Sequence, residues 1–121
     1  MLPEEATECA DKDYVYFRRF DKHQRDFLKT LITDDVIEQH RQQPLGQHSE
    51  ALERLLLYFR RQPQADKYAI EALQPFRAYR IVALSGQRGV APREVEDTIY
   101  DSAEAAYHGV FLRRIQDLLE T

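Results

Sequence analysis

The chain has 121 residues, a net charge of -4 and one cysteine, which indicates a single domain with a modest core and no intrachain disulfide framework. Its acidic balance argues against general nucleic-acid binding, for which a basic protein is expected. The acidic start, Met1 to Glu5, lacks the pattern of a signal peptide, and no apolar run approaches the roughly 20 residues of a membrane span, so we expect a cytoplasmic protein that enters no membrane.

The first 12 residues are acidic and show no hydrophobic periodicity, which predicts a flexible tail that can order against a partner. Residues 13–121 are then a single α+β domain. From Asp13 to about Ile32, apolar residues recur at helical spacing with charged residues opposite, which predicts an amphipathic helix. We expect its three phenylalanines to pack in the core, and the alternative is an aromatic face held against another protein.

Two further helices are predicted before the middle of the chain. Thr33 has the character of an N-cap, and the helix that it begins extends from Asp34 to about Gln42, before the breakers Pro44 and Gly46. Ser49 caps a second helix that extends to about Arg61. Its main apolar stripe is flanked on both sides by Leu57 and Tyr58, and an apolar arc of this width favours contact with more than one neighbour.

The next stretch is typical of a small antiparallel sheet. Two runs rich in β-branched and aromatic residues, Lys67 to Ile70 and Tyr79 to Leu84, predict two strands that Gln74-Pro75 separates. We interpret Val90 to Glu96 as a loop, and Asp97 to Tyr100 as a short third strand.

A last helix is predicted from Asp101 to about Leu119, with Asp101 and Glu104 forming an acidic capping box. Its buried stripe is Tyr107, Val110, Phe111, Ile115 and Leu118. Arg114 projects within the same arc, where it needs a carboxylate or carbonyl partner because burying an unpaired charge is costly.

The predicted fold class is therefore α+β, with three N-terminal helices, a small antiparallel sheet and a packed C-terminal helix; an all-α fold is the alternative. The predicted core consists of Phe17, Phe20, Phe27, Leu31, Leu52, Leu55, Phe59, Ile70, Ile81, Ala83, Val110, Phe111 and Ile115.

No stretch carries a self-sufficient active site. The four histidines are scattered along the chain, and only His40 and His48 straddle a loop that could bring them together, so we expect no tightly bound metal or cofactor. Cys9 lacks the basic neighbour that activates a thiol. Basic-aromatic clusters such as Tyr58 to Arg61 could stack bases, but on helices their aromatic residues face the core, so we expect no nucleic-acid partner.

The second half of the chain carries a resemblance to a known family. The runs that carry it, in order, are Tyr58-Phe59-Arg60-x-Gln62-Pro63, Lys67-Tyr68-x-Ile70, Tyr79-Arg80-Ile81, Ala105 and Val110-Phe111-Leu112-Arg113-Arg114-Ile115-x-Asp117. Together they resemble the small subunit of N,N-dimethylformamidase, a two-component amide hydrolase. In that family the large subunit carries a mononuclear iron and the catalytic residues, while the small subunit is helical with a small sheet. The resemblance therefore implies an accessory subunit with no catalytic, cofactor or metal residues of its own and a larger catalytic partner.

Two other functions remain open at this point. One is a free-standing binding or regulatory domain that forms a homodimer. The other is a stand-alone hydrolase, which would require a cleft with convergent polar groups that no sequence motif indicates. Our candidates for a partner interface or a structural clamp are Leu57, Tyr58, Arg60, Arg113 and Arg114. Arg60 and Arg114 are the arginines that we expect to grip a carboxylate. The candidate acceptors within the chain are Glu71, Asp97 and Asp101.

Overall fold

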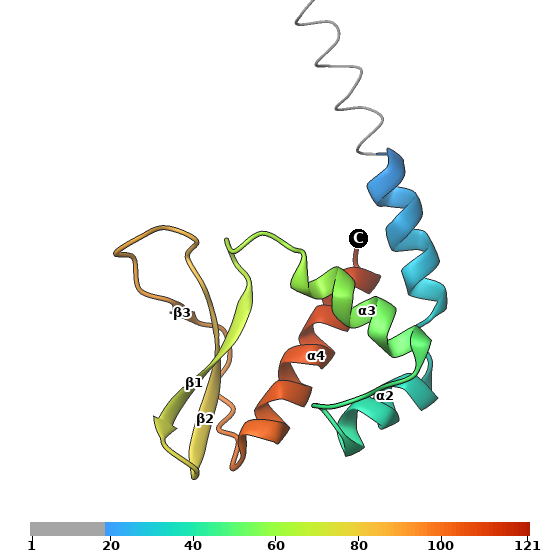
Figure 1. The fold of residues 1–121 in the computed structure, drawn as a ribbon. Helices are drawn as coiled ribbons and strands as arrows, with labels where there is room; N and C mark the ends of the chain where they lie inside the picture. Colours follow the sequence, from blue (N-terminus) through green and yellow to red (C-terminus); the bar gives the residue numbers. More distant parts are fainter. Residues whose placement is uncertain (1–18) are drawn as a thin grey trace, which may run out of the picture.

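The computed structural model describes residues 19–121, which form helices and one small sheet (Figure 1). The elements are a helix over residues 19–30, α2 (Asp34–Gln42), α3 (Glu50–Arg60), β1 (Tyr68–Gln74), β2 (Ala78–Ala83), β3 (Arg93–Glu94) and α4 (Ala103–Leu119). This confirms the α+β class. The predicted tail, Cys9, Phe17 and the beginning of the first predicted helix lie outside the described residues.

The sheet is antiparallel throughout and has the order β1-β2-β3. Its register pairs Ile70 with Ile81, and a bulge interrupts the pairing at Ala72 to Gln74, just before the hairpin turn. Phe76 lies in that turn with a positive φ of 67° and is 90% exposed. An aromatic residue in this conformation is a backbone outlier, because a Cβ atom is crowded in the left-handed region.

The position of the third strand differs from the prediction. β3 is Arg93–Glu94, inside the predicted loop, and it pairs with Val82 and Ala83. The predicted strand over residues 97–100 is wrong apart from Tyr100, which makes an isolated bridge to Tyr79. Both residues of β3 are exposed, so the strand depends on backbone hydrogen bonds and leaves no hydrophobic signal in the sequence.

Side chains cap the helices much as the sequence indicated. The hydroxyls of Thr33 and Ser49 accept hydrogen bonds from the backbone N–H groups at the starts of α2 and α3, which confirms both N-caps. The predicted cap of α4 is wrong by one residue. Ser102, and not Asp101, caps α4 and accepts from the backbone N–H of Ala105 at 3.1 Å. Both serine and aspartate are good N-caps, so the backbone conformation before α4 determines which of the two residues caps the helix.

α4 lies between the two other parts of the fold. Figure 1 shows the sheet on one side of α4 and the α2–α3 pair on the other. The close approach of α4 to β2 requires a glycine, because a Cβ atom on Gly109 would lie 2.5 Å from the Tyr100 hydroxyl and 3.1 Å from Ile81 Cδ1. None of the helices within residues 19–121 is long and apolar enough to cross a membrane.

The core contains most of the predicted residues, and it extends along both sides of α4. The buried hydrophobic residues are Leu28, Val36, Leu52, Leu55, Phe59, Ile81, Val82, Ala83, Ala106, Val110, Phe111, Ile115 and Leu118. Leu31 and Ile70 are only partly buried. Leu28 and Val36 are core residues that the sequence prediction lacked.

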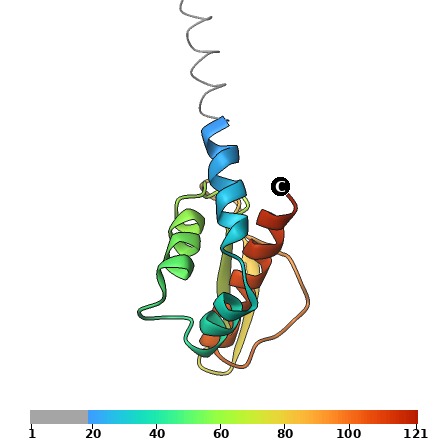
Figure 2. The ribbon, with the colours of Figure 1, turned by 90° about the vertical axis from the view of Figure 1, so that its right-hand side faces the viewer.

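Three residues that were predicted to be buried are exposed. Phe20 is 67% exposed, Phe27 is 50% exposed and Tyr107 is 40% exposed. Figure 2 shows that the helix over residues 19–30 extends past the rest of the described chain, so only its later part, at Leu28, meets the core. Periodicity identified an apolar face on this helix, but it could not tell how much of that face the chain itself covers.

Candidate functional site

Arg113 and Arg114 are adjacent on α4 and both point toward the sheet side, yet their surroundings differ. The Arg113 guanidinium donates two hydrogen bonds to the Glu96 carboxylate, at 2.8 and 3.0 Å, and one to the Val95 carbonyl at 3.3 Å. The Glu96 carboxylate also accepts from the Tyr100 hydroxyl at 2.7 Å. Burial, reinforced by Glu96, raises the pKa of Tyr100 to about 12. Arg113 is therefore an intrachain clamp that holds the segment before α4 onto the helix.

Arg114 has no such carboxylate partner among residues 19–121. Its guanidinium donates to the backbone carbonyl of Tyr68 at 3.2 Å, and burial lowers its pKa. The proposed acceptors Glu71, Asp97 and Asp101 are wrong for Arg114. Glu71 pairs instead with Arg80 at 3.0 Å, across the β1–β2 ladder.

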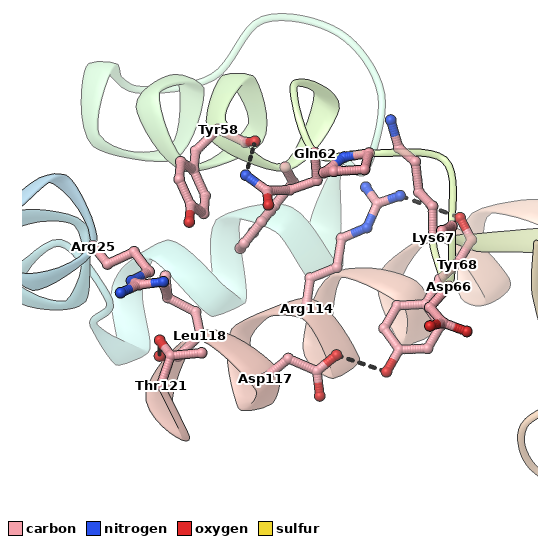
Figure 3. Close-up of a pocket in the computed structure, with 13 residues that line it drawn as sticks. Arg25, Tyr58, Gln62, Asp66, Lys67, Tyr68, Arg114, Asp117, Leu118 and Thr121 are labelled. Carbon is pink, nitrogen blue, oxygen red and sulfur yellow. Dashed lines mark hydrogen bonds between the residues drawn. The ribbon is translucent and has the colours of Figure 1, made fainter. Parts of the chain in front are cut away.

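A pocket of about 270 Å³ opens beside Arg114 (Figure 3). It lies between the end of α3, the connection to β1, and the last turns of α4. The residues that line it are Arg25, Tyr58, Phe59, Gln62, Pro63, Ala65, Asp66, Lys67, Tyr68, Arg114, Asp117, Leu118 and Thr121. We call it the Arg114 pocket.

The polar groups of the Arg114 pocket divide into two sets. The two side-chain carboxylates already have partners, because Asp117 accepts from the Tyr68 hydroxyl at 2.6 Å and Asp66 pairs with Arg93 at 3.2 Å. Two of the cations contact backbone carbonyls only: Arg114 as above, and Lys67, whose Nζ donates to the Arg60 carbonyl at 2.9 Å. The third, Arg25, pairs with Asp21 at 3.0 Å. The arrangement can hold an anion.

The other candidate residues lie around this pocket on α3. Tyr58 lines it and is half-buried, which raises the pKa of the phenol. Leu57 is 44% exposed, next to Tyr58 in the chain. The Arg60 side chain is exposed, and only its backbone carbonyl contacts a pocket residue. Whether these side chains form an interface remains a prediction.

Three histidines that are far apart in the sequence lie close together in the fold and form a second cluster. Nδ1 of His40 lies 2.9 Å from Nδ1 of His108, and the His40 ring also stacks on Phe111 with centroids 4.0 Å apart. His48 follows at 6.2 Å between ring centroids, so the two histidines that straddle the loop do approach each other. Sequence reasoning missed His108, because its position next to His40 depends on how α4 packs against α2.

The histidine geometry is that of hydrogen-bonded side chains. A bond between two Nδ1 atoms requires one ring to carry the proton and the other to accept it. Both nitrogens of His48 also have partners, the Glu53 carboxylate at 3.3 Å and the Gln43 carbonyl at 2.6 Å. Among residues 19–121, no three histidine, cysteine or carboxylate side chains are grouped as a metal site requires.

Protonation of the buried ring is disfavoured. His40 is only 3% exposed, and burial, together with the charges of His108 and His48, lowers its pKa to about 4. Burial and nearby Arg41 also lower the pKa of His108. At neutral pH this pair is a neutral, structural contact between α2 and α4.

The similarity of the chain to known proteins extends over almost its whole length. Residues 15–121 match the family model described as N,N-dimethylformamidase alpha subunit. The chain is 33% identical over 119 residues to the N,N-dimethylformamidase alpha subunit of an Alcaligenes species, covering 94% of this chain and 89% of the relative. It is 31% identical over 113 residues to the alpha subunit of the same name from Paracoccus aminophilus, covering 89% and 79%. The chain therefore belongs to the N,N-dimethylformamidase alpha subunit family.

Proposed function

We propose that this chain is the accessory, non-catalytic small subunit of a two-component amide hydrolase, and that it stabilises a larger catalytic subunit. Family membership over residues 15–121 is the observation that carries the proposal. The relatives are named as subunits of an enzyme that acts on N,N-dimethylformamide, an amide whose hydrolysis breaks the C–N bond. We assign the reaction to the complex as a whole.

Two features of the described residues support an accessory role. His40, His48 and His108 are used in hydrogen bonds to each other or to neighbouring groups, and the side-chain carboxylates that line the Arg114 pocket are paired. Exposed apolar side chains are also plentiful, and Phe20, Phe27 and Leu57 are among them. Large apolar side chains on a small protein favour a protein interface.

We further propose that the iron of the enzyme is held by the large subunit. The absence of a grouped set of three or more histidine, cysteine or carboxylate side chains among residues 19–121 supports this assignment. This subunit would then act by holding the catalytic chain in its active conformation.

Co-expression with a candidate large subunit from the same genome tests the proposal. An affinity tag on this chain should recover both chains in a fixed ratio, and the purified complex should hydrolyse N,N-dimethylformamide. Iron measured by elemental analysis should follow the large subunit, and this chain alone should contain none. The proposal is wrong if this chain elutes alone, or as a stable homodimer, when the large subunit is present and folded.

A further inference from the structure

Arg114 differs from the other partly buried arginines in residues 19–121, each of which has a carboxylate partner. Those ion pairs are Arg25–Asp21 at 3.0 Å, Arg80–Glu71 at 3.0 Å and Arg113–Glu96 at 2.8 Å. Arg114 instead makes one hydrogen bond, to a neutral carbonyl. A guanidinium carries five donors, and leaving a half-buried charge without a counter-ion is costly. The described fold therefore leaves this cation incompletely satisfied.

The direction of the side chain is informative. Figure 3 shows the Arg114 guanidinium reaching toward Lys67 and Gln62, away from the Asp117 carboxylate on the same helix. Asp117 is turned toward the Tyr68 hydroxyl. Two cations therefore face the Arg114 pocket from one side, although like charges repel each other, and a ligand of negative charge would relieve this repulsion.

Apolar side chains border the pocket. Tyr58 and Leu118 line it, and their chain neighbours Leu57 and Leu119 are 44% and 50% exposed. A charged group beside apolar side chains is typical of a protein interface, where the apolar contacts exclude water from a central polar contact. A volume of about 270 Å³ is ample for one acidic side chain.

We propose that the Arg114 pocket receives a carboxylate of the catalytic subunit, which binds the Arg114 guanidinium through two parallel hydrogen bonds. The proposal rests on the proposed function, because the catalytic subunit supplies the carboxylate. Arginine suits this role since its planar fork matches both oxygens of a carboxylate and keeps its charge at working pH. The pocket is thus an anchor point between the two chains.

Binding of purified variants to the large subunit is the first test. Arg114→Met should raise the dissociation constant at least about thirtyfold, because it leaves the partner's carboxylate buried without a counter-ion. Arg114→Lys should give a smaller loss, since it keeps the charge but not the fork. The matched control is Arg41→Met, an exposed arginine on α2 that pairs with Glu38, and it should leave binding unchanged.

The isolated chain provides the folding control. Arg114 makes a single hydrogen bond within the described residues, so Arg114→Met should shift the melting midpoint by no more than about 5 °C. A variant that melts normally yet fails to bind locates the defect at the interface. If Arg114→Met binds as tightly as the wild type, the pocket proposal is overturned while the proposed function stands. If the wild-type chain itself does not bind, both fall.

Cross-linking identifies the source of the carboxylate. Arg114→Lys places an amine in the pocket, and a zero-length carbodiimide reagent joins an amine to a carboxylate that touches it, with loss of water. Mass spectrometry of the complex should find position 114 joined to an acidic residue of the large subunit. A link to an acidic residue among residues 1–18 of this chain would assign the pocket to its own tail and overturn the proposal.

Small carboxylates provide the last comparison. Acetate should perturb the Arg114 side-chain NMR signals of the free chain at millimolar concentration, and assembly with the large subunit should abolish this response. If acetate binds equally well to the assembled complex, the pocket is open there and takes a small carboxylate, which contradicts the proposal.

Discussion

At the scale of single residues, neighbouring arginines of α4 have opposite roles. Arg113 satisfies its charge within the chain, through the Glu96 carboxylate and the Val95 carbonyl. Arg114 has no carboxylate partner among residues 19–121, because its side chain extends into the pocket and away from Asp117. Sequence adjacency on a helix separates two side chains by about 100° around the axis, which is enough to give them different partners.

The Arg113–Glu96 pair should contribute to the stability of the isolated chain. The side chains are 31% and 20% exposed, so the pair lies between the surface and buried extremes. We expect Arg113→Met to lower the free energy of unfolding by about 1–3 kcal/mol, since Glu96 loses its counter-ion. Urea unfolding at neutral pH measures this change. A double-mutant cycle with Glu96→Gln should give a coupling energy above roughly 0.5 kcal/mol, and a coupling near zero would contradict the clamp.

The His40–His108 contact should make the chain sensitive to acid. The folded pKa of His40, about 4, lies below the value of roughly 6.5 expected for the unfolded chain. The unfolded state therefore binds more protons between these values, and stability falls as the pH falls from about 6.5 to 4. His40 alone should account for a loss on the order of 3 kcal/mol over that window.

Urea unfolding at a series of pH values tests this sensitivity. His40→Leu should flatten the dependence between pH 6.5 and 4, because an apolar side chain in the same site takes up no proton. His23→Asn, on the exposed surface of the first helix, is the matched control and should keep the wild-type slope. An unchanged slope for His40→Leu would show that other groups cause the acid sensitivity.

At the scale of elements, the β1–β2 hairpin carries an unusual turn. Phe76 combines a positive φ with 90% exposure, so it has the cost of the left-handed region without the benefit of burial. Its backbone N–H donates to the Tyr79 hydroxyl at 2.9 Å, which helps to hold the turn. Asparagine tolerates this conformation much better than phenylalanine does.

Phe76→Asn should therefore raise the stability of the isolated chain by up to about 1 kcal/mol. The thermal midpoint of the purified chain measures this, and Phe76→Val, a β-branched residue that suits a positive φ poorly, should lower it. A lower midpoint for Phe76→Asn would mean that the ring makes a stabilising contact. If the variant is more stable yet binds the large subunit less tightly, the phenylalanine serves the interface.

At the scale of the whole molecule, the described chain leaves part of its apolar surface uncovered. The first helix meets the core through Leu28, which is 3% exposed, while Phe20 and Phe27 remain in contact with solvent. The proposed function accounts for this surface, because a large subunit would cover what a chain of this size cannot bury alone.

The double variant Phe20→Ser/Phe27→Ser should alter the unfolding free energy of the isolated chain by less than about 2 kcal/mol, since Phe20 is 67% exposed and Phe27 is 50% exposed. Leu28→Ser is the contrasting variant and should cost about 3 kcal/mol or more, because it empties a core site. Binding to the large subunit should weaken for the double variant. Strong destabilisation of the free chain by the double variant would show that these rings are buried in solution.

The sequence by itself determined the local structure and the family. Caps at Thr33 and Ser49, the ends of α2 and α4, and the runs of β1 and β2 could be predicted because capping and periodicity act over a few residues. The matched runs also predicted the family. For these features, the residues of a short segment are sufficient to predict its structure.

Only the tertiary structure decided which groups meet. The third strand is Arg93–Glu94 and not the predicted segment, because it is held by backbone hydrogen bonds that leave no pattern in the side chains. The tertiary structure joined His40 to His108 across 68 residues, and it gave Arg113 a carboxylate partner, whereas Arg114 has none within residues 19–121. Such contacts depend on how α4 sits between the sheet and the helix pair, because packing brings together side chains that are far apart in the chain.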